Sequence, residues 1–102
     1  MKFEVTASFK GDWSRLSERE RRLFREALPG FNEAGDRIAA DLAARFPASL
    51  RVKDVENAPG VLEMTWNFSG PDGRATFEWV TIDDNRGVRW RRIGGHAIFK
   101  KA

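Results

Sequence analysis

Residues 61–93 read VLEMTWNFSGPDGRATFEWVTIDDNRGVRWRRI, and apolar and polar residues alternate within three parts of this stretch. The alternating segments are 61–68, 74–82 and 88–93. A period of two residues is typical of β-strands that bury one face. The residues between the segments are rich in Gly, Pro, Asp and Asn, which favour turns. We therefore predict three consecutive strands that form a meander.

The same alternation predicts what each face of the three strands carries. One face is apolar and aromatic, and we expect it to pack against helices. By this parity Arg92 belongs with the apolar face, and Ile93 belongs with the opposite face. That opposite face is polar and basic, and it comprises Glu63, Thr65, Asn67, Arg74, Thr76, Glu78, Arg89 and Arg91.

The start of the chain carries a further strand pattern. Phe3, Val5 and Ala7 alternate with polar residues, which predicts a strand over residues 2–8. Gly11 and Asp12 then predict a break between this strand and the next element.

Helical patterns follow this strand. Ser17 and Glu20 fit a capping box, so a helix should begin near residues 14–17. Apolar residues at helical spacing continue as far as Phe46, and Pro47 should end the run. Pro29 removes a backbone donor, so it either kinks one helix or separates two; the sequence leaves both arrangements open.

These elements predict a single α+β domain over residues 1–102, because a chain of this length is too short for two ordinary domains. The expected order is β-α-α-β-β-β. A helical hairpin should cover one face of a mainly antiparallel sheet of about four strands.

The composition excludes several chemistries. The chain has no Cys and one His, so thiol catalysis, disulfide scaffolds and His-cluster metal sites are not expected, and we predict no cofactor. It shows neither a signal peptide nor an apolar run long enough to cross a membrane, which favours a cytoplasmic protein without membrane contact.

Charge is unevenly distributed along the chain. Residues 1–85 contain twelve Lys or Arg and fifteen Asp or Glu, whereas residues 86–102 contain six basic residues and no acid. Such a basic end suits a polyanion or an acidic protein partner, although short basic tails also serve solubility.

Three segments resemble the RelE/ParE superfamily of bacterial toxins: LRVKDVENAPGVLE (50–63), GRATF (73–77) and IGGHAIFK (93–100). The resemblance implies a RelE-like fold and a cognate antitoxin as partner. It also implies one of two activities. The RelE branch cleaves messenger RNA on the ribosome, and the ParE branch poisons DNA gyrase. A catalytically inactive binding module that keeps the fold is a third interpretation.

Metal-independent RNA cleavage needs a base for the ribose 2′-hydroxyl, cations around the phosphate and an acid for the leaving oxygen. His96 titrates near neutrality and matches a catalytic position of RelE-like nucleases, although a structural role at a strand end fits it equally. The resemblance assigns Arg74 to the scissile phosphate; an ion pair with Glu63 or Glu78 is the alternative. Glu63 stands where RelE has lysine, so it is either a second proton carrier or a structural partner of an arginine.

Five further residues are expected to bind RNA. Arg89 and Arg91 share the polar face with Arg74 by parity, and cations there would contact phosphates without reading sequence. The resemblance adds Lys53, Lys100 and Phe99, the last as a base-stacking aromatic. The chain has no tyrosine, so Phe99 cannot exchange a proton as a tyrosine would.

Overall fold

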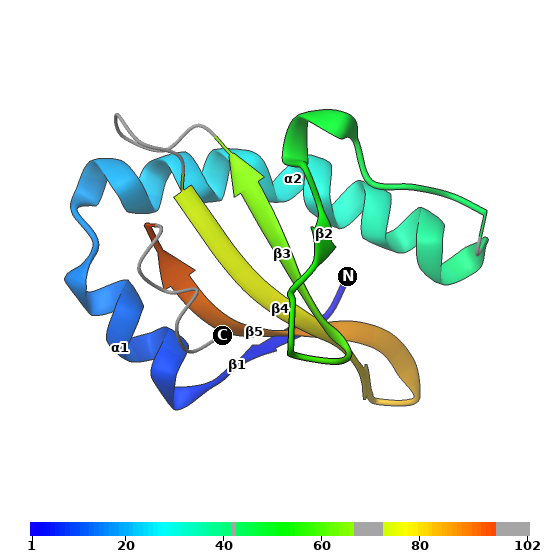
Figure 1. Cartoon of the computed structure of the whole chain (residues 1–102). Helices are drawn as coiled ribbons and strands as arrows, with labels where there is room; N and C mark the ends of the chain where they lie inside the picture. Colours follow the sequence, from blue (N-terminus) through cyan, green and yellow to red (C-terminus); the bar gives the residue numbers. More distant parts are fainter. Residues whose placement is uncertain (42, 67–72, 96–102) are drawn as a thin grey trace.

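A computed structural model describes residues 1–41, 43–66 and 73–95 of the chain. Two helices pack on one face of a five-stranded mixed sheet (Figure 1). The strand order is β1-β5-β4-β3-β2. In chain order the elements are β1 Phe3–Val5, α1 Ala7–Arg15, α2 Glu18–Ala40, a 3-10 turn η1 Ala48–Leu50, β2 Lys53–Asp54, β3 Val61–Trp66, β4 Gly73–Ile82 and β5 Asn85–Gly94.

The predicted α+β class and the antiparallel meander are confirmed by β3, β4 and β5. The sheet has five strands rather than about four, because Lys53–Asp54 pairs with β3 at one edge. At the other edge β1 lies parallel to β5, which makes the sheet mixed. The α2 helix crosses behind the strands in the view of Figure 1.

The first strand is shorter than predicted because Thr6 caps a helix. Its hydroxyl accepts a hydrogen bond from the Phe9 amide at 3.0 Å and donates one to the Arg91 carbonyl at 2.7 Å. The α1 helix therefore begins at Ala7, and Gly11–Asp12 lies inside it rather than in a turn. Phe9, two residues beyond Ala7 in the apolar alternation, is buried from this helix.

The α2 helix runs through Pro29 without ending there. Its capping box is confirmed, since Ser17 and Glu20 exchange side-chain and backbone hydrogen bonds. Pro29 and Gly30 are exposed, so the carbonyl that loses its donor faces water and the helix continues. The hairpin is thus made by α1 and α2, and α2 ends at Ala40, before Pro47.

The core between helices and sheet is aromatic. Phe31 of α2 lies 4.8 Å from Trp90 of β5 and 5.0 Å from Phe77 of β4, measured between ring centroids. Phe24 lies 5.3 Å from Trp90 and from Trp66. These rings fix α2 against the strands, which leaves the polar sides of β3, β4 and β5 on the other face.

A β-bulge changes the predicted facing of β5. The register shifts at Thr76 and Phe77 of β4, so that Thr76 pairs with Arg92 while Phe77 pairs with Trp90. The extra residue on β5 reverses the alternation beyond it. Ile93 is consequently buried in the core at 1% exposure, and its predicted place on the polar face is wrong.

Candidate functional site

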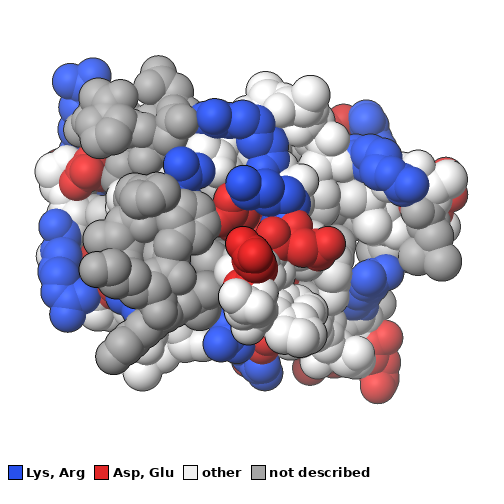
Figure 2. All heavy atoms as spheres, in the orientation of Figure 1, with Lys and Arg blue, Asp and Glu red and all other residues white. Residues whose placement is uncertain are grey.

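The face of the sheet without helices carries most of the predicted site residues that the structure describes. Acidic and basic side chains lie next to one another on this face in Figure 2. Cross-strand pairing arranges them in rows, because directly opposed residues point to the same side of a sheet. One row contains Lys53, Glu63 and Thr76, and a neighbouring pair contains Thr65 and Arg74.

Glu63 is the buried centre of the first row. Its side chain is 1% exposed, and its Oε1 lies 3.4 Å from the ammonium nitrogen of Lys53, which is 71% exposed. Neither carboxylate oxygen has a hydrogen-bond partner, and the same holds for the buried hydroxyl of Thr76 opposite. Buried polar atoms are nearly always hydrogen-bonded, so such a group calls for an explanation such as a functional role.

Arg74 opens β4 and contacts the next residue pair. Its Nη1 donates a hydrogen bond to the hydroxyl of Thr65 at 2.8 Å, and Thr65 is itself buried.

Arg89 and Arg91 lie on the predicted face but meet acids there. Glu78 of β4 accepts hydrogen bonds from both, one on each carboxylate oxygen. Arg89 also reaches Glu4 of β1, with Nη2 2.9 Å from Oε1. The hydrogen bonds to Glu78, then those to Glu4, raise the pKa of Arg89 above its ordinary value. Two acids thus offset much of the positive charge that the sequence placed on this side.

Arg92 contacts α1 rather than this group. Its Nε and Nη2 donate to the two oxygens of Asp12 at 2.6 and 2.9 Å, and the Ile93 amide donates to Asp12 at 3.1 Å. Burial of Asp12 opposes its ionisation, but these hydrogen bonds prevail and hold the pKa of the carboxyl below its ordinary value. The Asp12 hydrogen bonds likewise raise the pKa of Arg92.

Asp12 was not predicted as a buried partner, because Gly and Asp together favour an interruption between elements. The signal that could have found it is an acid on the same helical face as apolar residues, namely Phe9 and Leu16, three and four positions away. A charged residue on such a face is buried only when it is paired.

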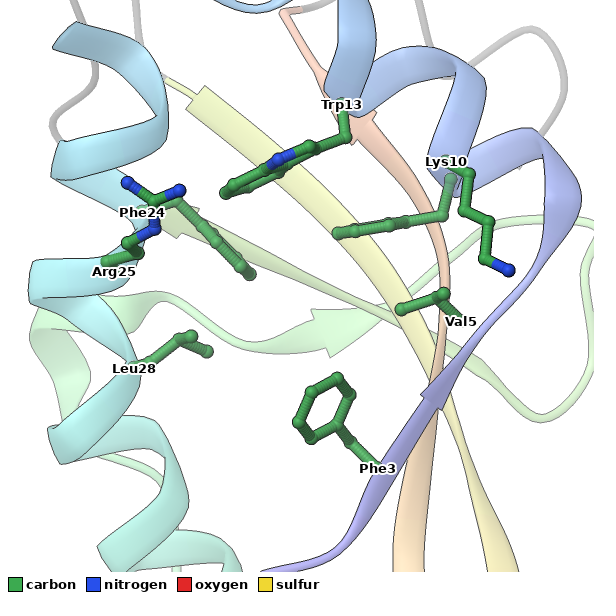
Figure 3. A pocket seen from close by; sticks show the side chains of 8 residues that line it. Phe3, Val5, Lys10, Trp13, Phe24, Arg25 and Leu28 are labelled. Carbon is green, nitrogen blue, oxygen red and sulfur yellow. The ribbon is translucent and has the colours of Figure 1, made fainter. Parts of the chain in front are cut away.

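A pocket of about 330 Å³ lies on the helix side of the sheet, between β1, α1 and α2 (Figure 3). Phe3 and Val5 point into it from β1, and Trp13 and Leu28 from the helices. None of the predicted site residues that the structure describes lines this pocket.

Three predicted site residues, His96, Phe99 and Lys100, lie outside the described residues, so the structure does not place them. Asn67, expected on the polar face, lies outside as well. In the described ranges, no group of three or more His, Asp or Glu side chains could hold a metal ion. The two described helices include none that is long and apolar enough to cross a membrane.

Comparison with known proteins adds no relative. No family model matches the chain, and neither a curated protein nor a solved structure matches it. The resemblance to the RelE/ParE superfamily therefore stays a prediction from the sequence.

Proposed function

We propose that this protein is a RelE-like toxin that acts in the cytoplasm and cleaves messenger RNA on the ribosome without a metal ion, with an antitoxin as its restraining partner. One observation carries the proposal most directly. The Glu63 carboxylate is buried on the helix-free face with both oxygens lacking hydrogen bonds, beside the cation of Lys53. A carboxylate in this state is a ready acceptor for a proton or a hydroxyl group.

In this mechanism Glu63 is the general base. It takes the proton of a ribose 2′-hydroxyl, the 2′-oxygen attacks the adjacent phosphorus, and the bond to the 5′-oxygen breaks. The products are a 2′,3′-cyclic phosphate and a free 5′-hydroxyl. Because Glu63 is 1% exposed, the reaction requires that the side chains over it move aside. Lys53 is exposed and flexible, so it can exchange Glu63 for a phosphate when RNA binds.

Cations and an acid complete the proposed site. Arg74, which opens β4 beside Thr65, would bind the scissile phosphate, because a guanidinium can donate to two phosphate oxygens at once. Arg91 would bind the RNA backbone by exchanging its contact with Glu78 for a phosphate. Arg89 would have to give up contacts with two acids, Glu4 and Glu78, to do the same. The resemblance supplies the remaining roles: His96 protonates the leaving oxygen, Phe99 stacks on a base, and Lys100 extends the phosphate track.

Primer extension on ribosome-bound messages after induced expression tests the proposal. We expect new 5′ ends within coding regions. Removal of a general base costs roughly 10²- to 10⁴-fold, so Glu63→Gln should abolish visible cleavage, as should Arg74→Ala and His96→Ala. Arg86→Ala is the matched control, because Arg86 is an exposed arginine on β5 whose guanidinium lies over the Trp79 ring. Each variant is first checked for an unchanged melting temperature.

Other outcomes assign other functions. Intact messages together with inhibition of gyrase supercoiling by the purified chain would favour a ParE-like inhibitor. Absence of both effects, with growth unaffected, would favour the inactive binding module. Unchanged cleavage by Glu63→Gln would remove Glu63 from the mechanism while leaving the fold as described.

A further inference from the structure

The pocket between β1, α1 and α2 has an apolar interior and an exposed aromatic at its mouth. Its walls are made by Phe3, Val5, Phe9, Trp13, Phe24 and Leu28. Phe3 is 65% exposed. Among the residues that the structure describes, it is the one large apolar side chain that is exposed to solvent. An apolar hollow joined to an exposed aromatic is typical of a surface that binds another chain.

The neighbouring edge of β1 has main-chain groups available for pairing. The Lys2 carbonyl accepts from the Val88 amide at 3.2 Å, and the Thr6 amide donates to the Trp90 carbonyl at 3.0 Å. Main-chain groups of successive residues in a strand point to opposite edges. The amides and carbonyls of Phe3 and Val5 therefore point away from β5, and no described strand pairs with that edge.

Two cations flank the same pocket. Lys10 of α1 and Arg25 of α2 contribute to its lining, and the described lining residues include no acid. Lys10 has no ion-pair partner among the described residues. Arg25 pairs with the exposed Glu18 at 3.6 Å, and its guanidinium lies over the Trp13 ring, 5.3 Å from the ring centroid. In Figure 3 the Lys10 and Arg25 side chains lie on the two helices that border the hollow. A partner that places carboxylates here gains attraction from both sides.

We infer that this face binds an extended, acidic segment of a partner protein, which adds as a strand along β1. Strand addition satisfies the outward amides and carbonyls of Phe3 and Val5, and it places alternate side chains of the partner on the two sides of the sheet. The apolar side chains enter the pocket, and neighbouring carboxylates meet Lys10 and Arg25. A helix would leave the β1 edge unpaired, because its own backbone groups are already bonded. This binding does not depend on whether the protein cleaves RNA.

A displayed library of random ten-residue peptides tests the inference with the whole chain as bait. We expect the enriched peptides to combine Asp or Glu with large apolar residues at alternate positions. Their binding should fall at least tenfold against Phe3→Asp and against Arg25→Glu. Arg22→Glu is the matched control, because Arg22 is an exposed α2 arginine with one exposed ion pair, like Arg25, but lies outside the pocket. Its binding should equal that of the unaltered chain.

Amide hydrogen exchange identifies the binding mode. When an enriched synthetic peptide is bound, the amides of Phe3 and Val5 should become protected at least tenfold. The Thr6 amide, already bonded to Trp90, should change little and serves as the internal control. The inference is overturned if no peptide is enriched, if the enriched peptides are basic, if Arg22→Glu weakens binding as much as Arg25→Glu, or if Phe3 and Val5 gain no protection.

Discussion

Replacement of Asp12 by alanine should be among the most destabilising single changes in the protein. The substitution removes the acceptor of two hydrogen bonds from Arg92, at 2.6 and 2.9 Å, and of a third from the Ile93 amide, at 3.1 Å. The Asp12 side chain is 6% exposed and that of Arg92 24%. Loss of one partner costs ~3–5 kcal/mol for a fully buried pair. Because Arg92 can regain some water, we expect a loss of about 2–4 kcal/mol.

The effect is measured by urea and thermal unfolding followed through tryptophan fluorescence. At about 4–8 °C per kcal/mol for a domain of this size, the melting temperature should fall by roughly 8–32 °C. Glu33→Ala is the control, since it breaks an exposed pair with Arg37 on α2 and should cost at most about 0.5 kcal/mol. The double variant Asp12→Ala, Arg92→Met should be more stable than Asp12→Ala alone, because it removes the Arg92 cation together with the carboxylate that bound it.

Dependence on pH gives a second check of the same contact. The folded pKa of Asp12 is lowered, so its stabilising contribution is present above the ordinary carboxyl pKa of about 3.9 and is lost as the pH falls through the folded value. The gap between the unaltered chain and Asp12→Ala should be constant from pH 7 to about 5 and narrow below about 4. An Asp12→Ala protein as stable as Glu33→Ala, or a gap unchanged at low pH, would refute the assigned role.

Three other changes test neighbouring features. Glu63→Met should raise the free energy of unfolding by about 1–2 kcal/mol in urea titrations, because it replaces a buried carboxylate without hydrogen bonds by an apolar side chain of similar size; a loss of stability would indicate a structural role instead. Thr6→Val should cost about 1–2 kcal/mol by the same measurement, since the hydroxyl caps α1 and bonds to β5. Gly87→Ala should lower the free energy of unfolding by about 1–3 kcal/mol, because the added carbon would lie 2.6 Å from the Lys2 carbonyl oxygen and force β1 away from β5. The hydrogen exchange of the Thr6 amide should become faster, and unchanged exchange would contradict this packing.

Local patterns predicted the elements that depend on local rules. The capping box of Ser17 and Glu20 and the alternation within β3 and β4 each involve residues close in the chain, and both are confirmed. Thr6 shows the limit of such rules. Its neighbours continue a strand alternation, and the helix begins there because its hydroxyl also bonds to Arg91, a residue far away in sequence.

The bulge in β5 escaped prediction for a related reason. Nothing in the alternation of Val88, Trp90 and Arg92 marks an extra residue, and the gain from it appears only in three dimensions. The shift buries Ile93 at 1% exposure and brings the Arg92 guanidinium to Asp12. The alternation placed an isoleucine, Ile93, on a polar face beside arginines. That misfit is the signal that could have indicated a β-bulge, which shifts the alternation by one residue.

Counting charges along the sequence overstated how many cations are available for phosphate. Arg89 and Arg91 face Glu78, and Arg89 also faces Glu4, so their charges serve to join β1, β4 and β5. The β2 and β3 side of the same face is different, because its acid is buried with a single exposed lysine nearby. The strand register causes this contrast, because the pairing of β2 with β3 places Lys53 opposite Glu63. A strand as short as β2, with two residues, shows no periodicity from which this pairing could be predicted. The proposed chemistry therefore centres on β2 and β3, where the buried Glu63 carboxylate pairs with Lys53 but lacks hydrogen bonds, rather than on the arginine-rich end of the chain.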